Sequence, residues 1–428
     1  MTGLHGGNPW ALVKPRSGSA RRAPFGMSQQ RPREGVGSAV RASAQRADAL
    51  LHRPRSRQRE SSLANHARSA DEACSTHTPH ADTPVRILDF SANFNPVGPP
   101  PELESVLQEG WERIRWYPEP TYREFREAVA KREGVDPSWI LPGNGTADLI
   151  HLISRWKARG RVAVVVPTFT EYERAAQADQ SEILPLHQRE ELDFFPDALG
   201  IRIKSLGSVQ LLFLCNPNNP TGRLWPMKPL QELLEACQRA GTVVVVDEAY
   251  MEFLEDRLRY SAVPWVKRFQ NLIVLRSMTK IFAVPGIRIG YAVACEETAI
   301  ALRQIQPPWP MNTLAASLGE RLIGESGFLE RSRRKIAGFH QQLRVGLQGL
   351  PGITSVPSEA NFILCRLAGP VVTAQGLAQE LVRRGILIRV CDDFTGLEPG
   401  RFVRVAVRRP NENQRLLQAL QEIFPHAG

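Results

Sequence analysis

The sequence has little of what marks membrane proteins, disulfide-stabilised domains and zinc modules. None of its apolar runs approaches the ~18 residues that span a bilayer, so we expect no membrane partner. Only six of its 428 residues are cysteine, and none forms a Cys-x-x-Cys pair. This scarcity argues against a structural zinc site and a disulfide framework and is typical of a reducing compartment. We therefore expect a cytoplasmic protein without a bound metal.

Positive charge is concentrated in the first 84 residues. They hold 13 basic and 6 acidic residues, a net of +7, out of a net charge of +10 for the chain. The remaining 41 basic and 38 acidic residues nearly cancel, which gives nucleic-acid binding by the body little electrostatic support. The head shows no sustained apolar periodicity, so we predict a disordered basic extension over 1–84. A transit peptide, or a start codon set too far upstream of Met27, are alternatives that the sequence leaves open.

From Val85 onward, short β-branched runs alternate with amphipathic segments. This alternation predicts an α/β fold, with a mostly parallel sheet between helices and a smaller α+β domain. We expect an N-terminal segment associated with the small domain (85–114), a large domain (115–308) and a small C-terminal domain (309–428). The expected strands are 162–166, 210–214, 242–246, 272–275, 289–294, 361–366, 387–390 and 401–407. The expected helices are 149–156, 230–239, 298–304, a long stretch from 309 to about 347, 374–384 and 411–424.

An acidic residue stands where one predicted strand ends. Four valines, 243–246, run directly into Asp247, and Tyr250 follows three residues later. In open α/β sheets the carboxyl ends of the strands face the ligand crevice. A carboxylate buried there needs a partner, because an unpaired buried charge is costly. The alternative is that Asp247 caps the next helix.

A second polar group follows the strand expected over 272–275. Ser277, Thr279 and Lys280 lie within four residues, and Arg288 comes shortly after. Hydroxyls and backbone N–H groups in such a turn suit a phosphate, and Arg288 adds a cation for it. A lysine desolvated in the crevice becomes a nucleophile able to form a Schiff base. The alternative is a solvated loop lysine.

Three further strings are candidates for the same crevice. Residues 215–222, Cys-Asn-Pro-Asn-Asn-Pro-Thr-Gly, form a stiff turn that would aim Asn219 at a ligand. Gly145 and Thr146 precede an apolar helix, whose first N–H groups can hold an anion. Phe169 follows another predicted strand and offers an aromatic ring. An ordinary turn, a helix cap and core packing are the respective alternatives.

In their order along the chain, these strings resemble those of fold-type I pyridoxal-phosphate (PLP) enzymes of the class I/II aminotransferase superfamily. The resemblance covers about residues 86–424. Within the superfamily the chain resembles most the threonine-phosphate decarboxylases of cobalamin biosynthesis, with the histidinol-phosphate aminotransferases next. The strings that favour the decarboxylases include 89–96, 116–118, 308–315 and 386–391.

The resemblance implies a role for each candidate residue. Lys280 would bind PLP covalently, Asp247 would pair with the pyridine nitrogen, and these two with Tyr250 would be catalytic. Asn219 and Tyr250 would donate hydrogen bonds to the ring 3′-oxygen, and Phe169 would stack on the ring. The cofactor phosphate would be bound by Gly145, Thr146, Ser277, Thr279 and Arg288. Tyr117 would reach the cofactor phosphate from a neighbouring subunit, so a homodimer with shared active sites is expected.

The substrate residues follow from the same resemblance. Arg404 would hold the substrate carboxylate, since a guanidinium suits that bidentate contact. Asn219 would also bind the substrate. Arg389 and Asn361 would hold a distal phosphate. For the two arginines, the alternative is a surface ion pair.

The activity that the resemblance implies is decarboxylation of L-threonine O-3-phosphate to (R)-1-aminopropan-2-ol O-2-phosphate, in the aminopropanol arm of cobalamin biosynthesis. The expected partner is thus a phosphorylated amino acid, with no nucleic acid and no membrane. The first alternative is a histidinol-phosphate aminotransferase or a related transaminase. A remote one is a PLP-sensing DNA-binding regulator, which the basic head suggests, although that head lacks a helix-turn-helix pattern.

Overall fold

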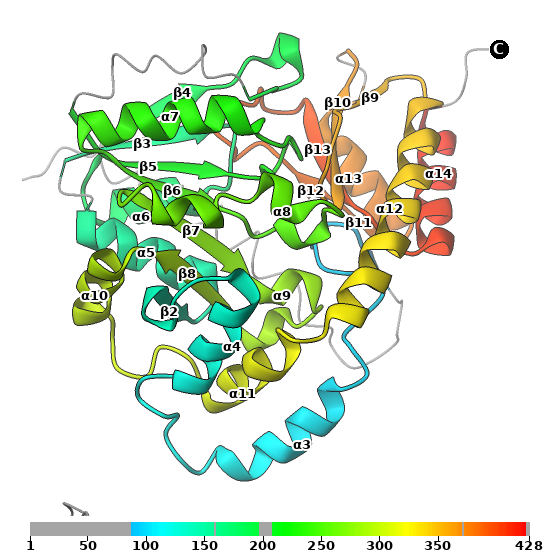
Figure 1. Cartoon of the computed structure of the whole chain (residues 1–428). Coiled ribbons are helices and arrows are strands. Elements are labelled where there is room, and N and C mark those ends of the chain that lie inside the picture. Colours follow the sequence, from blue (N-terminus) through cyan, green and yellow to red (C-terminus); the bar gives the residue numbers. More distant parts are fainter. Residues whose placement is uncertain (1–86, 158–159, 197–207, 370–371, 425–428) are drawn as a thin grey trace, which may run out of the picture. The chain divides into compact units, whose positions relative to one another are not determined.

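The computed structural model of the chain describes residues 87–157, 160–196, 208–369 and 372–424. The basic extension expected over 1–84 therefore lies outside the described residues. Within them, a seven-stranded sheet is flanked by helices, and a four-stranded sheet has helices of its own (Figure 1). No helix in these ranges is both long and apolar enough to cross a membrane.

The larger sheet is mostly parallel, as the sequence predicted. In spatial order its strands are β2 (Ile140–Gly143), β8 (Gly290–Ala294), β7 (Leu272–Ser277), β6 (Val243–Asp247), β5 (Val209–Cys215), β3 (Arg161–Val166) and β4 (Glu182–His187). All pairs from β7 to β4 are parallel. Strand β8 alone runs against both of its neighbours, β7 and β2. The carboxyl ends of β3, β5, β6 and β7 consequently share one edge of the sheet.

Helices cover both faces of this sheet because its strands are apolar on both sides. Successive strand residues point to opposite faces, and they divide between two apolar clusters. Phe213 and Val245 pack with α5 (Thr146–Lys157) and α6 (Glu171–Ala178), whereas Leu214 and Val246 share a cluster with α7 (Met227–Ala240). This two-sided burial accounts for the uninterrupted valine runs in the sequence.

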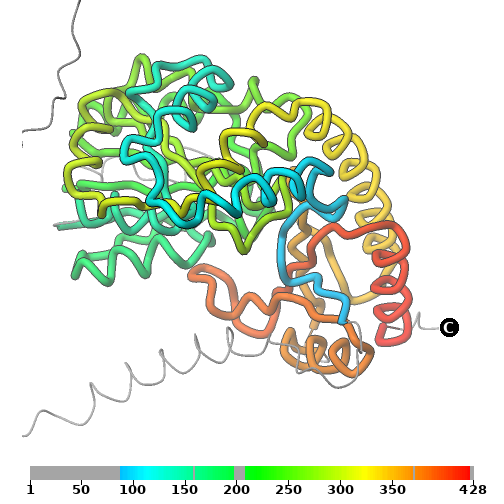
Figure 2. The backbone as a smooth tube through the Cα atoms, turned by 90° about the horizontal axis from the view of Figure 1, so that it is seen from below, coloured from blue at the N-terminus to red at the C-terminus, as the bar shows by residue number. Residues whose placement is uncertain are grey.

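The smaller sheet is antiparallel and contains strands from the C-terminal part of the chain. Its order is β12 (Arg389–Val390), β13 (Phe402–Ala406), β10 (Phe362–Leu367) and β9 (Ile353–Ser355). Its associated helices are α12 (Ser326–Gln348), α13 (Ala374–Arg383) and α14 (Pro410–Ile423). Strand β1 (Leu88–Asp89) pairs with β11 (Ile386–Leu387), so the first described residues lie beside these C-terminal elements (Figure 2).

The remaining helices and two short strands refine the expected pattern. The helical stretch expected from 309 to about 347 is two helices, α11 (Thr313–Leu322) and α12, because the chain turns around Gly324. Strands β2 and β4 were missed, since each contains a proline and neither has a continuous β-branched run. The other helices of the described ranges are α3 (Leu103–Arg113), α4 (Arg123–Glu133), α8 (Arg257–Tyr260), α9 (Met278–Ile281) and α10 (Glu296–Ile305).

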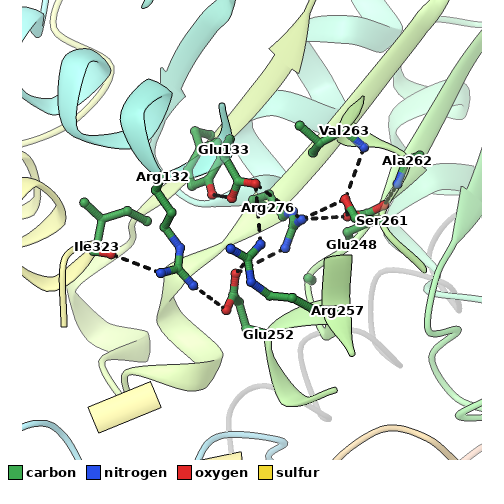
Figure 3. Close-up of polar contacts among 12 residues, drawn as sticks. Arg132, Glu133, Glu248, Glu252, Arg257, Ser261, Ala262, Val263, Arg276 and Ile323 are labelled. Atoms are coloured by element: carbon green, nitrogen blue, oxygen red, sulfur yellow. Dashed lines mark hydrogen bonds and ion pairs between the residues drawn. The ribbon is translucent and has the colours of Figure 1, made fainter. Parts of the chain in front are cut away.

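A buried cluster of ionised side chains lies behind the carboxyl ends of β6 and β7 (Figure 3). At its centre, the Arg276 side chain is 2% exposed, and its guanidinium lies 3.0 Å from Glu248 and 3.3 Å from Glu252. Glu252 also accepts hydrogen bonds from Arg132 of α4 and Arg333 of α12, at 2.8 and 2.6 Å. The cluster thus joins two strand ends to two helices.

This cluster and the predicted site residues lie on opposite sides of the same strand ends. Glu248 follows Asp247 and Arg276 precedes Ser277, and adjacent strand residues point to opposite faces. Burial alone would raise the pKa of Glu252, but Arg276 and three further arginines outweigh burial and lower this pKa to about 2. The contribution of Glu252 to stability is therefore present above the ordinary glutamate pKa and is lost as the pH falls toward 2.

We predict that Glu252→Gln lowers the free energy of unfolding at pH 7 by about 3 kcal/mol, because it leaves buried arginines without their counter-charge. Urea denaturation at pH 7 and at pH 3 measures the effect, which should shrink at the lower pH because Glu252 is then protonated in the unfolded chain but still ionised in the folded one. Glu109→Gln is the control, since the Glu109–Arg321 pair is at the surface with side chains 62% and 58% exposed. We expect it to cost less than about 0.5 kcal/mol; equal losses in the two variants would contradict the assignment.

Candidate active site

A cavity lies at the edge where β5, β6 and β7 end, and it gathers residues that are far apart in the sequence. The predicted residues that line it are Thr146, Phe169, Asn219, Asp247, Tyr250, Ser277, Thr279, Lys280 and Arg288. They come from the start of α5, from the last residues of β6 and β7, from the turns after β3, β5 and β6, from α9 and from the segment before β8. The rule that strand ends share one crevice thus brings these residues together.

One corner of the cavity is suited to a phosphate. The hydroxyls of Ser277 and Thr279 lie 2.8 Å apart, and Thr146 opens α5 at the cavity wall. Gly145 has a φ of 79°, and a Cβ there would lie 2.6 Å from Nη2 of Arg288. Glycine therefore both permits the turn and leaves room for the guanidinium. Hydroxyls, a helix start and an arginine around one space are the donors that phosphate oxygens accept from.

Asp247 is held by two hydrogen bonds at the base of the cavity. Its Oδ1 accepts from the backbone N–H of Ala249 at 3.0 Å, and its Oδ2 accepts from the hydroxyl of Tyr172 at 2.8 Å. Burial raises the pKa of Asp247 to about 6, against the lowering effects of Tyr172, Ala249 and Lys280. Capping of the following turn accounts only for the bond from Ala249. The second oxygen of Asp247 is bound by Tyr172, which lies 75 positions earlier in the chain.

Tyr172 is a site residue that sequence reasoning did not assign. Its ring stacks on Phe213 at 5.1 Å and meets the edge of Phe169 at 5.7 Å, so its hydroxyl is fixed toward Asp247. Burial, with the negative charge of Asp247, raises the pKa of Tyr172 well above 10, and the hydroxyl stays a neutral donor. In the sequence Tyr172 stands three residues after Phe169, but that spacing does not identify its hydrogen-bond partner.

Lys280 stands between positive and negative groups. Burial, together with the charges of Arg404 and Arg288, lowers the pKa of Lys280 to about 8, while Asp247 acts in the opposite direction. Near neutral pH a measurable fraction of this amine is therefore unprotonated. The alternative of a solvated loop lysine does not hold, because Lys280 lines the cavity.

A second cavity adjoins the first and shares Phe169, Asn219, Tyr250 and Lys280 with it. Arg404, only 6% exposed, lies in its wall. Its guanidinium donates to Oδ1 of Asn219 and to the Ser91 carbonyl at 2.7 Å. Both acceptors are neutral, and no carboxylate of the described residues lies within ion-pair distance of Arg404.

The other predicted residues lie in different settings. Arg389 lines the second cavity but is paired with Asp393 at 2.5 Å. Asn361 is fully buried, both of its amide atoms lack a hydrogen-bond partner, and it lines neither cavity. Tyr117 is 78% exposed, stacks on Trp309 at 4.3 Å and also lies outside both cavities. The roles expected of these residues stay predictions.

The fold and the site define the class of protein. The family described as aminotransferase class I and II matches residues 85–420, and the chain belongs to it. It is therefore a PLP-dependent enzyme of fold type I, as its sequence motifs predicted.

Particular relatives are similar over most of this chain. A threonine-phosphate decarboxylase of Salmonella typhimurium is 35% identical, over 80% of this chain and 92% of that protein. A histidinol-phosphate aminotransferase of Symbiobacterium thermophilum is 32% identical, over 78% of this chain and 90% of that protein. The crystal structure of L-threonine-O-3-phosphate decarboxylase from Porphyromonas gingivalis matches with a TM-score of 0.70 at 29% identity, over 79% of this chain and 99% of that one.

The chemistry of the cavity fits PLP. The corner at Gly145 and Arg288 can receive its phosphate, the amine of Lys280 can react with its aldehyde, and the carboxylate of Asp247 can face a basic ring nitrogen. Nothing in the donor set suits a metal instead, and the described ranges contain no group of three potential metal ligands. The fit thus extends to the phosphate, the aldehyde and the ring nitrogen of the cofactor.

We predict that cofactor-free protein captures PLP faster as the pH rises to about 8, because only the neutral amine of Lys280 is a nucleophile. Below that pH the rate should change about tenfold per pH unit and above it should level off. Stopped-flow absorbance measures the rate, and mass spectrometry after borohydride reduction locates the PLP. Lys280→Ala should abolish reducible PLP and turnover, whereas Lys335→Ala, at an exposed position of α12, should behave as wild type. PLP attached to another lysine would contradict this prediction.

Proposed function

We propose that this enzyme is a carboxy-lyase that converts L-threonine O-3-phosphate to (R)-1-aminopropan-2-ol O-2-phosphate and CO₂, a step of cobalamin biosynthesis. The identity of 35% to a protein named threonine-phosphate decarboxylase supports the reaction class. The observation that supports an anionic substrate is the environment of the Arg404 side chain. It is a buried cation in the second cavity with neutral contacts alone among the described residues.

A buried guanidinium without a counter-charge is expensive, so its environment favours an anionic ligand. Arg276 shows the contrast, because an equally buried arginine there has carboxylates on several sides. In our proposal the carboxylate of the substrate becomes the counter-ion of Arg404. Asn219, which already accepts from Arg404, would turn one amide N–H toward the same carboxylate.

The substrate phosphate needs a second cation close to the first. Arg389 lines the same cavity as Arg404 and would have to exchange Asp393 for the phosphate. Phosphate carries more charge than a carboxylate and offers more acceptor oxygens, so this exchange is favourable for a guanidinium. Asn361 is buried with both amide atoms free of partners in the structure, and we propose that it contributes a donor to this region.

When bound, PLP supplies withdrawal of electrons from the substrate Cα, which allows the carboxylate to leave as CO₂. In our proposal Asp247, fixed by Tyr172 and Ala249, keeps a negative charge opposite the ring nitrogen. Tyr250 and Asn219 would donate hydrogen bonds to the ring oxygen. Lys280, with its pKa near 8, carries the proton that replaces the carboxylate on Cα. One proton is consumed for each CO₂ released, and no amino acceptor is required.

We further propose that the enzyme is a homodimer with shared active sites. Trp116 and Tyr117 are 74% and 78% exposed. Trp309, which stacks on Tyr117, and Trp111 are exposed as well. Exposed aromatics of this size beside a groove mark an interaction surface more often than free solvent contact. A partner that covers this surface could also present its Tyr117 to the phosphate corner of the other subunit.

We predict that PLP-loaded enzyme releases CO₂ from L-threonine O-3-phosphate at the same rate with or without 2-oxoglutarate. Labelled CO₂ and the amine product are measured together. Strict dependence on 2-oxoglutarate, with formation of glutamate, would instead make the protein a transaminase such as histidinol-phosphate aminotransferase.

The arginine assignment is tested in the same assay. Arg404→Lys should lower kcat/KM on the order of 100-fold, because a point charge cannot replace the bidentate fork. Arg366→Lys is the matched control, since Arg366 lies on the same small sheet but is paired with Glu190. We expect it to leave kcat/KM within about twofold.

The shared site predicts that two inactive variants restore each other. Lys280→Ala and Tyr117→Ala should each be nearly inactive alone. When they are unfolded and refolded together, half of the dimers are mixed and each has one complete site, so about a quarter of wild-type activity should return. Light scattering establishes the dimer. A monomer, or a mixture that stays inactive although mixed dimers form, would contradict the proposal.

A further inference from the structure

The segment 91–95 runs from the wall of the second cavity to the helix that carries Lys280. It follows β1, which is paired with β11, and it lines the second cavity. The backbone carbonyl of Ser91 accepts from the guanidinium of Arg404, and the side-chain amide of Asn93 lies beside that guanidinium. Two residues further on, the backbone N–H of Asn95 donates to the carbonyl of Lys280 at 2.9 Å. One short stretch of chain therefore contacts both Arg404, which we propose binds the substrate carboxylate, and the backbone of Lys280, which we propose is the reactive lysine.

Asn95 completes the hydrogen bonds at the end of α9, the four-residue helix that carries Lys280. The last carbonyls of a helix have no partner within it and must find one elsewhere. Those of Met278 and Thr279 accept from the backbone N–H groups that follow α9. The carbonyl of Ile281 accepts instead from the side-chain amide of Asn95 at 2.8 Å, across 186 residues of sequence.

Burial and hydrogen bonds fix the conformation of the Asn95 side chain. It is fully buried, its Nδ2 also donates to the hydroxyl of Ser332 in α12 at 3.0 Å, and its Oδ1 accepts from the N–H of Val97 at 2.9 Å. Its amide thus connects α9, α12 and the 91–97 segment at one point. A four-residue helix is far below the length at which helices persist on their own, so α9 depends on such external bonds.

We propose that Asn95 is a positioning residue that fixes the Lys280 end of α9 against α12, and so sets the place of the Lys280 amine relative to Arg404. The inference rests on the proposed role of Lys280 but is independent of which substrate the enzyme decarboxylates. Its physical basis is that each contact of the Asn95 amide is buried and directional. Loss of the amide leaves the Ile281 carbonyl unsatisfied, which favours fraying of α9 into the cavity.

The test is the titration of Lys280 in cofactor-free Asn95→Ala. The rate at which a small acylating reagent modifies Lys280 is measured against pH by mass spectrometry, so neither PLP nor turnover is needed. Fraying would expose the amine to water, and desolvation is the first cause of its lowered pKa. We expect the midpoint of the titration to rise by about one pH unit, and PLP capture at pH 7 to slow about tenfold.

The chain offers a matched control in Asn413. It is also fully buried, accepts from a backbone N–H with Oδ1, and donates to an α12 carbonyl, that of Phe339, at 3.2 Å. It lies in α14 and lines neither cavity. Asn413→Ala should lower stability by a similar amount without moving the Lys280 titration. Ser332→Ala, which keeps the bond to Ile281, should shift the titration less than Asn95→Ala does.

An unchanged titration in folded Asn95→Ala would overturn the inference and leave Asn95 a structural residue like Asn413. Equal shifts in the Asn95 and Asn413 variants would overturn it as well. If Asn95→Ala does not fold, Asn95→Ser replaces it, since serine leaves a smaller cavity and also removes the donor to Ile281. A shift in the Lys280 titration combined with no decarboxylase activity in the wild type would support Asn95 and refute the proposed substrate.

Discussion

The chemistry of this enzyme depends on one electrostatic balance at the end of a parallel sheet. The Lys280 amine lies where two adjoining cavities meet, one lined by Arg288 and the other by Arg404, and the buried carboxylate of Asp247 opposes their charge. The surplus of positive charge lowers the pKa of the amine and makes the cavity attractive to anions. The same arrangement therefore suits a phosphate-bearing cofactor and, in our proposal, an anionic substrate. Removing water from these groups strengthens every one of their interactions.

That balance is supported by structure on the opposite face of the same strands. Because neighbouring strand residues alternate between faces, Asp247 and Ser277 point into the cavity while Glu248 and Arg276 enter the buried ion cluster. Strand ends in a sheet are ordinarily its least restrained parts. Here a network of fully buried charges holds them, and α12 joins that network through Arg333. A stable network on one face is thus coupled to a reactive site on the other.

Much of the fold and the cavity could be predicted from local patterns. Valine runs that end in Asp247 or in Ser277 identify strands and the edge at which they end, and parallel strands bring those ends together. The contacts of single side chains could not be predicted in this way. The bonds from Tyr172 to Asp247 and from Asn95 to Ile281 each span many residues of sequence. Nor does any pattern distinguish Arg389, which is ion-paired, from Arg404, which is not.

The sequence alone determined the class of fold and predicted that Lys280 and Asp247 lie at one edge of the sheet, because these inferences depend on periodicity and on short ordered motifs. The tertiary structure decided which charges are compensated and which are left for a ligand, because compensation depends on distances between segments that meet only after folding. Arg276 and Arg404 are similar in the sequence, as single arginines within apolar runs. Three glutamates surround the first and neutral oxygens surround the second, and that difference makes one arginine structural and the other available to an anion.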